Sequence, residues 1–189
     1  MQPDAQLIQI LAISGSLRAQ SSNTALLQAA IVLAPDDVKI RLYGELGALP
    51  HFNPDLEPDE PLAVTRLRQQ LRGCDGLLLC SPEYAHGVPG VLKNALDWLV
   101  SGEEFVGKPI ALFNASPRAT HAQASLVEIL TVMSGQIVPD ASIDVPLLGR
   151  NLNADRIVAD PELAIVIRTA IVVFADAINS LRLDRAESG

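Results

Sequence analysis

The chain has 189 residues, 49% of them hydrophobic and 19% charged, and its formal net charge is −8. This composition excludes global disorder and predicts a single folded domain over residues 1–189 with a sizeable core. An acidic surface without a run of Lys or Arg disfavours nucleic acid as a partner, and the lack of a long uninterrupted apolar stretch predicts no membrane insertion.

Short apolar runs alternate with longer segments of helical period, which indicates an α/β protein. Strands are expected at residues 7–13, 38–42, 76–80 and 109–114, with a fifth inside residues 136–145. Helices are expected at residues 23–34, 61–72, 90–101 and 120–134, and a last one after the N-cap Asp160. Near-continuous apolar strands joined by helices favour a three-layer, doubly wound, five-stranded parallel sheet. Residues 184–189 are expected to form a frayed tail.

The start of the chain is acidic, and the apolar run that follows is too short for a signal peptide, so we expect a cytoplasmic protein. Cys74 and Cys80 would lie roughly 20 Å apart on one strand, which is beyond disulfide reach and predicts free thiols in the core. The three histidines are scattered and lack zinc-like spacing, so no metal site is expected.

In a doubly wound sheet, ligands bind beyond the carboxyl ends of the strands, which directs attention to the loops at residues 14–23, 81–90 and 115–120. The first of these loops joins a strand directly to a helix, so its free backbone N–H groups favour an anion. Because the loop lacks both the Gly-Lys-Ser/Thr signature and the three-glycine dinucleotide turn, a terminal phosphomonoester fits it better.

Side-chain donors reinforce this anion site. They are Ser16, Arg18, Ser21, Ser22 and Asn23, and Arg18 adds a charge-assisted contact. An ordinary polar loop with a Ser or Asn N-cap would have the same composition, and Asn23 is the residue most readily assigned to capping.

Two prolines and two glycines stiffen the loop at residues 81–90, which can present backbone groups to a flat heteroaromatic edge. Tyr84 and His86 can pack beside such a ring, although His86 fits an exposed loop position equally well. The following helix, at residues 90–101, is apolar on two sides. Its second face, near Val91, Ala95 and Trp98, predicts a homodimer or homotetramer interface, and burial within one chain is the alternative.

Both loops resemble the NADPH-dependent FMN reductase family of flavodoxin-like proteins, which includes quinone, azo-dye and chromate reductases. The matching residues are Gly15-Ser16-Leu17-Arg18-x-x-Ser21-x-Asn23, Pro82-Glu83-Tyr84, and Pro89-Gly90-x-Leu92-Lys93-Asn94-Ala95-Leu96-Asp97-Trp98. Residues 49–57 also look like the family's loop after its second strand. The resemblance implies the flavodoxin-like strand order 2-1-3-4-5, non-covalent FMN, NAD(P)H as co-substrate and a small-molecule electron acceptor.

By the same resemblance, Ser16, Arg18, Ser21, Ser22 and Asn23 would hold the FMN phosphate. The flavin ring would lie against Pro82, Glu83, Tyr84 and His86, and Ser116 would belong to a third flavin loop. Two departures from the family pattern stand out. Ala85 occupies a position where the family usually has Asn, and Pro117-Arg118 follows Ser116 where a glycine pair is common.

The implied activity is a ping-pong oxidoreduction, in which NAD(P)H reduces the flavin and an oxidised acceptor then takes the electrons from the same face. The cofactor carries this chemistry, so we expect no catalytic acid, base or nucleophile from the protein. Two alternatives are an FMN-binding electron carrier or redox sensor without nicotinamide turnover, and a phosphate-binding α/β domain without flavin.

Overall fold

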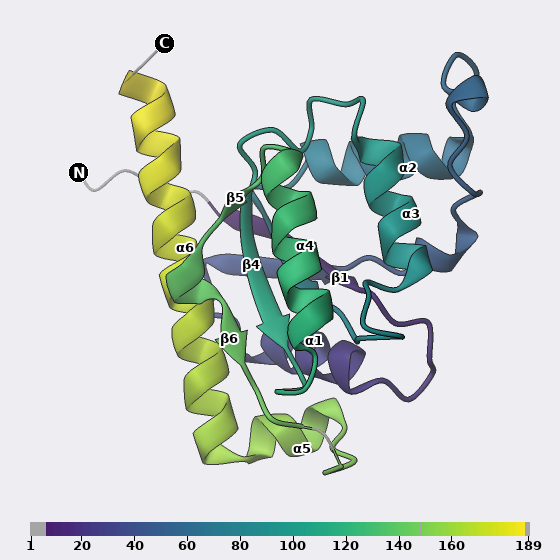
Figure 1. Ribbon diagram of the computed structural model, residues 1–189. Coiled ribbons are helices and arrows are strands. Elements are labelled where there is room, and N and C mark those ends of the chain that lie inside the picture. Colours follow the sequence, from purple (N-terminus) through teal and green to yellow (C-terminus); the bar gives the residue numbers. More distant parts are fainter. Residues whose placement is uncertain (1–6, 148, 188–189) are drawn as a thin grey trace.

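The computed structural model describes residues 7–147 and 149–187, and its elements pack around one parallel sheet (Figure 1). The strands are β1 (Ile8–Ser14), β2 (Val38–Leu42), β3 (Gly76–Cys80), β4 (Pro109–Asn114), β5 (Gln136–Ile137) and β6 (Ile143–Asp144). Their order is β2-β1-β3-β4-β5, and β6 also pairs with β4. This arrangement confirms the flavodoxin-like α/β prediction.

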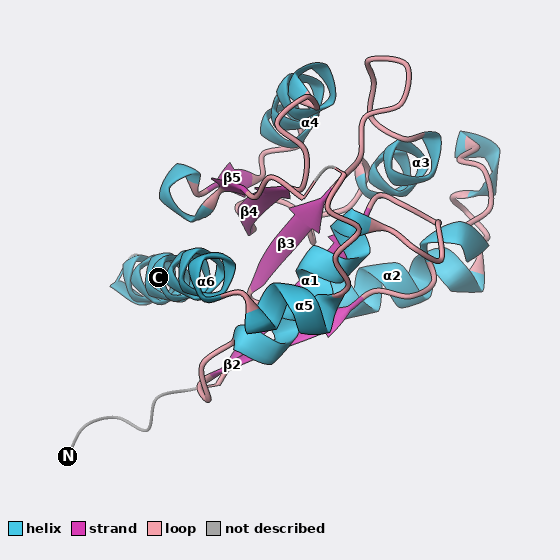
Figure 2. Ribbon diagram, turned by 90° about the horizontal axis from the view of Figure 1, so that it is seen from below, coloured by secondary structure: helices cyan, strands magenta, loops and turns pink. Residues whose placement is uncertain are grey.

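The described residues form six α-helices: α1 (Ser22–Leu33), α2 (Leu62–Arg72), α3 (Gly90–Leu99), α4 (Thr120–Val132), α5 (Ala154–Ala159) and α6 (Pro161–Glu187). The first core cluster joins α1 and α6 to one face of the sheet, and the second joins α2, α3 and α4 to the other (Figure 2). Within β1, Ile10 and Leu11 point to opposite clusters, as the two-residue period of a strand requires. Short α5, which precedes α6, was not expected from the sequence.

The last helix begins as expected, because the Asp160 carboxylate accepts hydrogen bonds from the N–H groups of Glu162 and Leu163, both at 3.2 Å. The helix continues through Glu187 instead of fraying after Leu183, and residues 188–189 lie outside the described residues. By length and composition alone α6 could cross a membrane. One stripe of α6 is nevertheless buried in the core, and a core helix has the same composition.

The fifth strand differs from the expected continuous one. It consists of β5 and β6 with a short 3₁₀ turn between them, which begins at Pro139. Proline has no N–H to donate to a ladder, so the chain leaves the sheet there. The Ser142 hydroxyl fills the gap by accepting from the Leu112 N–H at 3.1 Å and donating to the Val138 carbonyl at 2.9 Å.

Two of the three residues of the predicted subunit face on α3, Ala95 and Trp98, are covered by the chain itself, whereas Val91 is half-buried. Trp98 is fully buried, and Ala95 is 2% exposed. The covering segment is the loop after β2, because the Trp98 indole N–H donates to the Pro50 carbonyl at 2.8 Å and Phe52 packs edge-on against the indole. Hydrophobic periodicity cannot distinguish a covering loop from a covering subunit, which explains the error.

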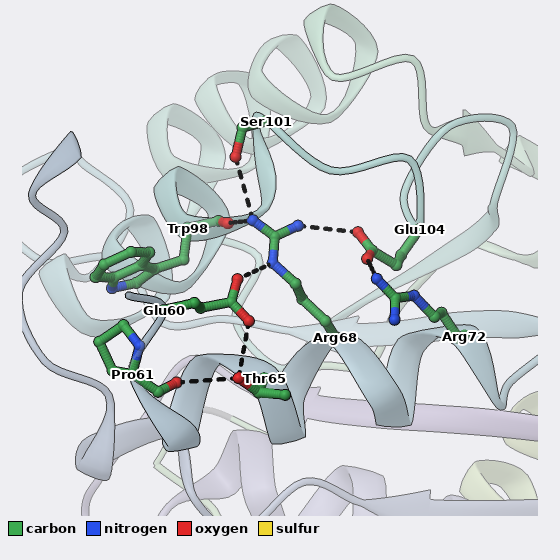
Figure 3. A network of polar contacts seen from close by, with 8 residues as sticks. All are labelled: Glu60, Pro61, Thr65, Arg68, Arg72, Trp98, Ser101 and Glu104. Atoms are coloured by element: carbon green, nitrogen blue, oxygen red, sulfur yellow. Dashed lines mark hydrogen bonds and ion pairs between the residues drawn. The ribbon is translucent and has the colours of Figure 1, made fainter. Parts of the chain in front are cut away.

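Charged side chains join α2 to the segment after α3 (Figure 3). Arg68, itself buried, donates to Glu60 at 2.6 Å, to Glu104 at 3.0 Å and to the Trp98 carbonyl at 2.7 Å. Arg72 forms a second ion pair with Glu104. Burial raises the pKa of the Glu104 carboxyl, but hydrogen bonds from its own backbone, Arg72 and Arg68 outweigh this effect and hold the pKa below its usual 4.5.

We predict that Glu104→Gln lowers the free energy of unfolding at pH 7 by about 1.5–3 kcal/mol, because two guanidinium groups lose a charged acceptor. Urea unfolding of both proteins measures the change. A carboxyl with a lowered folded pKa stabilises the protein above its unfolded pKa. The deficit should therefore vanish as the pH falls below about 4.5 through the folded pKa. Glu103→Gln, at an exposed neighbouring position, is the control for net charge; an equal loss there would contradict the prediction.

Candidate functional site

The loops that leave β1, β3 and β4 meet at the carboxyl edge of the sheet, as the sequence predicts. A cavity of about 340 Å³ lies between them. We call it the cradle, and its lining residues are Ser16, Arg18, Ser21, Ser22, Asn23, Pro82, Glu83, Tyr84, Ala115, Ser116, Arg118 and Ala119. All the predicted cofactor-binding residues except His86 line it.

Hydroxyl groups organise the part of the cradle at the start of α1. The Thr24 N–H donates to the Ser21 hydroxyl at 3.4 Å, and the Arg18 N–H donates to the Ser16 hydroxyl at 3.3 Å. The first turn of α1 contains no acidic residue that would repel an anion. Across the described ranges, no ion pair involves the exposed Arg18 guanidinium, which leaves it available to a ligand.

Ser21, not Asn23, is the N-cap of α1, so the capping role expected for Asn23 is corrected. Asn23 is the second residue of the helix and is buried against β3, where its side-chain oxygen accepts from the Cys80 thiol at 3.2 Å. Burial raises the pKa of the Cys80 thiol well above its usual range, so the group stays neutral and acts as a donor. Cys74 and Cys80 are both free and buried, as predicted.

The loop after β3 contains a tight turn whose two central residues, Ala85 and His86, have φ values of 49° and 58°. The backbones of Tyr84 and Gly87 close this turn with reciprocal hydrogen bonds of 3.1 and 3.0 Å. Positive φ at both central positions is the signature of a type I′ turn, which favours Asn and Gly. The family's usual Asn therefore suits the position of Ala85 for a conformational reason.

Glu83 and His86 connect the β3 and β4 loops beside the cradle. The Glu83 carboxylate accepts from the N–H of Ala122, in the first turn of α4, at 2.8 Å, and it lies 3.3 Å from His86 Nδ1. The His86 ring stands edge-on to His121 at 4.3 Å and is largely exposed. His86 thus contacts the wall from outside, and the pairing with His121 had no signal in the sequence.

The third loop is held by its own polar groups. The Ser116 N–H donates to the Asn114 side-chain oxygen at 3.1 Å, and the Arg118 N–H donates to the Ser116 hydroxyl at 3.3 Å. Asn114 also donates to Asp144 on β6 at 2.8 Å, which fixes the loop to the next strand. Arg118 lines the cradle where the family often has glycine.

A second, larger cavity of about 970 Å³ adjoins the cradle and shares Arg18 and Tyr84 with it. We call it the adjoining cavity. Leu17, the loop after β2 and the first half of α3 form its walls, with Leu46, Leu49, Phe52 and Val91 among the apolar side chains. The loop's resemblance to the family pattern hinted at a role, but sequence reasoning assigned none of these wall residues to a site.

Comparison with known proteins agrees with this geometry. Residues 8–146 match the profile of the NADPH-dependent FMN reductase family. The chain belongs to this family.

Two curated relatives and one solved structure illustrate the similarity. An NAD(P)H-dependent FMN reductase of Pseudomonas aeruginosa is 46% identical over 112 residues, which are 58% of this chain and 60% of that protein. A 2-hydroxy-1,4-benzoquinone reductase of a Burkholderia species is 39% identical over 112 residues, 58% of this chain and 61% of that protein. The match thus spans about three fifths of each relative. FerB, a flavoenzyme NAD(P)H:(acceptor) oxidoreductase from Paracoccus denitrificans, has a TM-score of 0.76 at 29% identity, covering 92% of this chain and 98% of FerB.

We predict that Ala85→Asn raises the free energy of unfolding by about 1 kcal/mol, because Asn tolerates the left-handed conformation better than Ala. Thermal or urea unfolding without added ligand measures the gain. Ala48→Asn, at an exposed position with negative φ, supplies the control. The strain argument fails if both substitutions have the same effect.

Proposed function

We propose that this protein is an FMN-dependent NAD(P)H oxidoreductase that passes electrons from a nicotinamide to a small-molecule acceptor. This proposal rests mainly on the cradle, where the hydroxyl-rich start of α1 meets the loops after β3 and β4. Family membership supports FMN as cofactor and NAD(P)H as co-substrate. The names of the relatives favour quinones or flavins as acceptors, and azo compounds and chromate remain further candidates of the same redox class.

The residues of the cradle fit the phosphate of FMN. Ser16, Ser21 and Ser22 supply hydroxyl groups at the N-terminus of α1, and Asn23 lies with its side chain at the same end of the cavity. The Arg18 guanidinium, which has no ion-pair partner among the residues that the structure describes, supplies positive charge for a dianionic phosphomonoester. The Asn23 side-chain oxygen accepts a hydrogen bond from the Cys80 thiol. The side-chain NH₂ group of Asn23 is therefore the one that can donate to a phosphate oxygen.

The remaining cradle residues position a ring and shield it. Bound FMN would supply the redox chemistry between NAD(P)H and the acceptor, and we propose that its reduction and its reoxidation alternate. Glu83 is the only carboxylate among the described residues of the cradle, and it is engaged by the Ala122 N–H and His86. Its contribution is to hold the β3 and β4 loops at a fixed separation, not to transfer a proton.

The adjoining cavity favours this enzymatic function over an electron carrier or redox sensor. A carrier needs an exposed cofactor edge, whereas a cavity beside the cradle offers room for a second small molecule. We also propose that the protein is cytoplasmic, that it forms a homodimer or homotetramer, and that it has no nucleic-acid or membrane partner. Burial of Trp98 removes the original argument for an interface on α3, so the oligomer rests on resemblance alone.

The direct test is a visible absorption spectrum of the purified protein, followed by anaerobic addition of NADH or NADPH. We expect flavin absorption that bleaches with a nicotinamide and returns when a quinone is added, with continuous NAD(P)H oxidation under turnover conditions. Bound FMN without nicotinamide turnover would support the carrier instead. A colourless protein that leaves the fluorescence of added FMN unquenched would indicate a phosphate-binding domain.

We predict that Arg18→Ala weakens FMN binding by about 1.5–3 kcal/mol, roughly tenfold to hundredfold in Kd, because the phosphate loses its charged partner. Riboflavin, which has no phosphate, should bind both proteins almost equally. Fluorescence quenching measures both ligands. Arg66→Ala, at an exposed position on α2, controls for net charge and should leave both affinities unchanged. An unaltered FMN-to-riboflavin ratio in Arg18→Ala would refute the phosphate assignment.

A further inference from the structure

A third cavity, of about 670 Å³, lies between the loop after β1 and the start of α5. We call it the polar groove, and its lining residues are Arg18, Ala19, Gln20, Ser21, Ser22, Thr24, Ala25, Gln28, Asn151, Leu152, Asn153, Ala154 and Arg156. It shares Arg18, Ser21 and Ser22 with the cradle, at the end where α1 begins, and residues 82–84 do not line it. A ligand that extends beyond the phosphate position of the cradle therefore enters the groove.

The groove is positively charged, although the chain as a whole has a net charge of −8. Its lining residues include two arginines and no aspartate or glutamate. Arg156, like Arg18, forms no ion pair within residues 7–147 and 149–187. Amide and hydroxyl groups make up most of the other polar surface, and they can donate hydrogen bonds to an anion.

The carboxylates closest in sequence to Arg156 leave its guanidinium available. Arg156 also borders a neighbouring hollow that contains Asp160 and Glu162, but no ion pair among the described residues joins it to either one. The Asp160 carboxylate is instead bound by the Arg150 guanidinium at 2.9 Å and by backbone N–H groups in the first turn of α6. Asp155, next to Arg156 on α5, is exposed and does not line the groove.

The wall that carries Arg156 is fixed to the rest of the fold. The Asn153 side chain caps α5 by accepting from the Arg156 N–H at 3.0 Å. The next residue, Ile157, is buried in the core, and α5 packs against α1 (Figure 2). The Leu147 N–H donates to the Ala115 carbonyl at 3.1 Å, which ties the segment before α5 to the loop after β4. Fixed walls lower the entropy cost of binding a ligand.

Family membership does not by itself account for this groove. The residues that match the family profile are 8–146, whereas Arg156 and the wall around it lie after them. FMN also ends at the phosphate for which the cradle is suited, so it leaves the far side of the groove without a ligand group. The free guanidinium there calls for a second phosphate.

We propose that the polar groove binds the adenylate group of a dinucleotide, with the adenylate phosphate on Arg156. This inference rests on the proposed function. Two redox dinucleotides carry an adenylate: FAD, in which it is joined to the flavin phosphate, and NAD(P)H, in which it is joined to the nicotinamide nucleotide. The position of the groove at the phosphate end of the cradle favours FAD.

The test compares Arg156→Ala with the wild-type chain in two arms. The flavin arm titrates FMN and FAD into each protein and follows the flavin absorbance. We expect Arg156→Ala to weaken FAD binding about tenfold and to leave FMN binding within about twofold, because only FAD carries the adenylate phosphate. The unchanged FMN affinity also shows that the variant is folded.

The nicotinamide arm measures flavin reduction in the FMN-loaded proteins by NADPH and by reduced nicotinamide mononucleotide, which has no adenylate. A loss of apparent affinity of about tenfold for NADPH alone would assign the adenylate to the nicotinamide cofactor instead of FAD. Arg168→Ala, at an exposed position on α6 outside all three cavities, is the control for net charge and should match the wild type in both arms.

Unchanged ratios of FAD to FMN and of NADPH to the mononucleotide in Arg156→Ala would overturn the proposal. An equal loss of FMN and FAD would also overturn it, by placing Arg156 on the flavin phosphate, as would the same losses in Arg168→Ala. Failure of the proposed function looks different. The wild-type protein would then bind flavin without being reduced by NADPH, while the flavin arm would still decide whether the groove binds an adenylate.

Discussion

The close approach of the β1 and β3 loops is the constraint on which the candidate site depends. A Cβ atom at Gly15 would stand 2.6 Å from the Ser81 hydroxyl and 3.2 Å from a Leu92 methyl group, so a side chain there would force these neighbours to move. Because β1 and β3 are neighbours in a parallel sheet, their carboxyl ends share one edge. The start of α1 and residues 82–84 of the loop after β3 therefore line the same cavity.

Hydrogen bonds between side chains and backbone groups fix the conformations of these loops. Glu83 reaches across to the N–H of Ala122, Asn114 orders the third loop, and Asn94 secures the loop after β2. Each bond replaces a backbone partner that regular secondary structure would have supplied. The two cavities consequently have walls from distant parts of the chain, although the helices and strands behind them are ordinary.

Sequence periodicity predicted the strands and helices well where local pattern and packing agree. It was less successful where a distant segment decides the outcome. Trp98 looked like a subunit contact because its cover, the loop after β2, has no hydrophobic period of its own. Asn23 looked like a cap because Ser21 and Asn23 have similar capping preferences. The break between β5 and β6 follows from Pro139, whose missing N–H interrupts the ladder of hydrogen bonds.

The sequence by itself determined the fold class and the family, because these depend on residue order and on hydrophobic periodicity. Only the tertiary structure decided that Asn23 bonds to Cys80, that His86 stands outside the cradle, and that a second cavity adjoins it. Those features require contacts between residues far apart in the chain. Their energies depend on distance in space, which local sequence pattern does not encode.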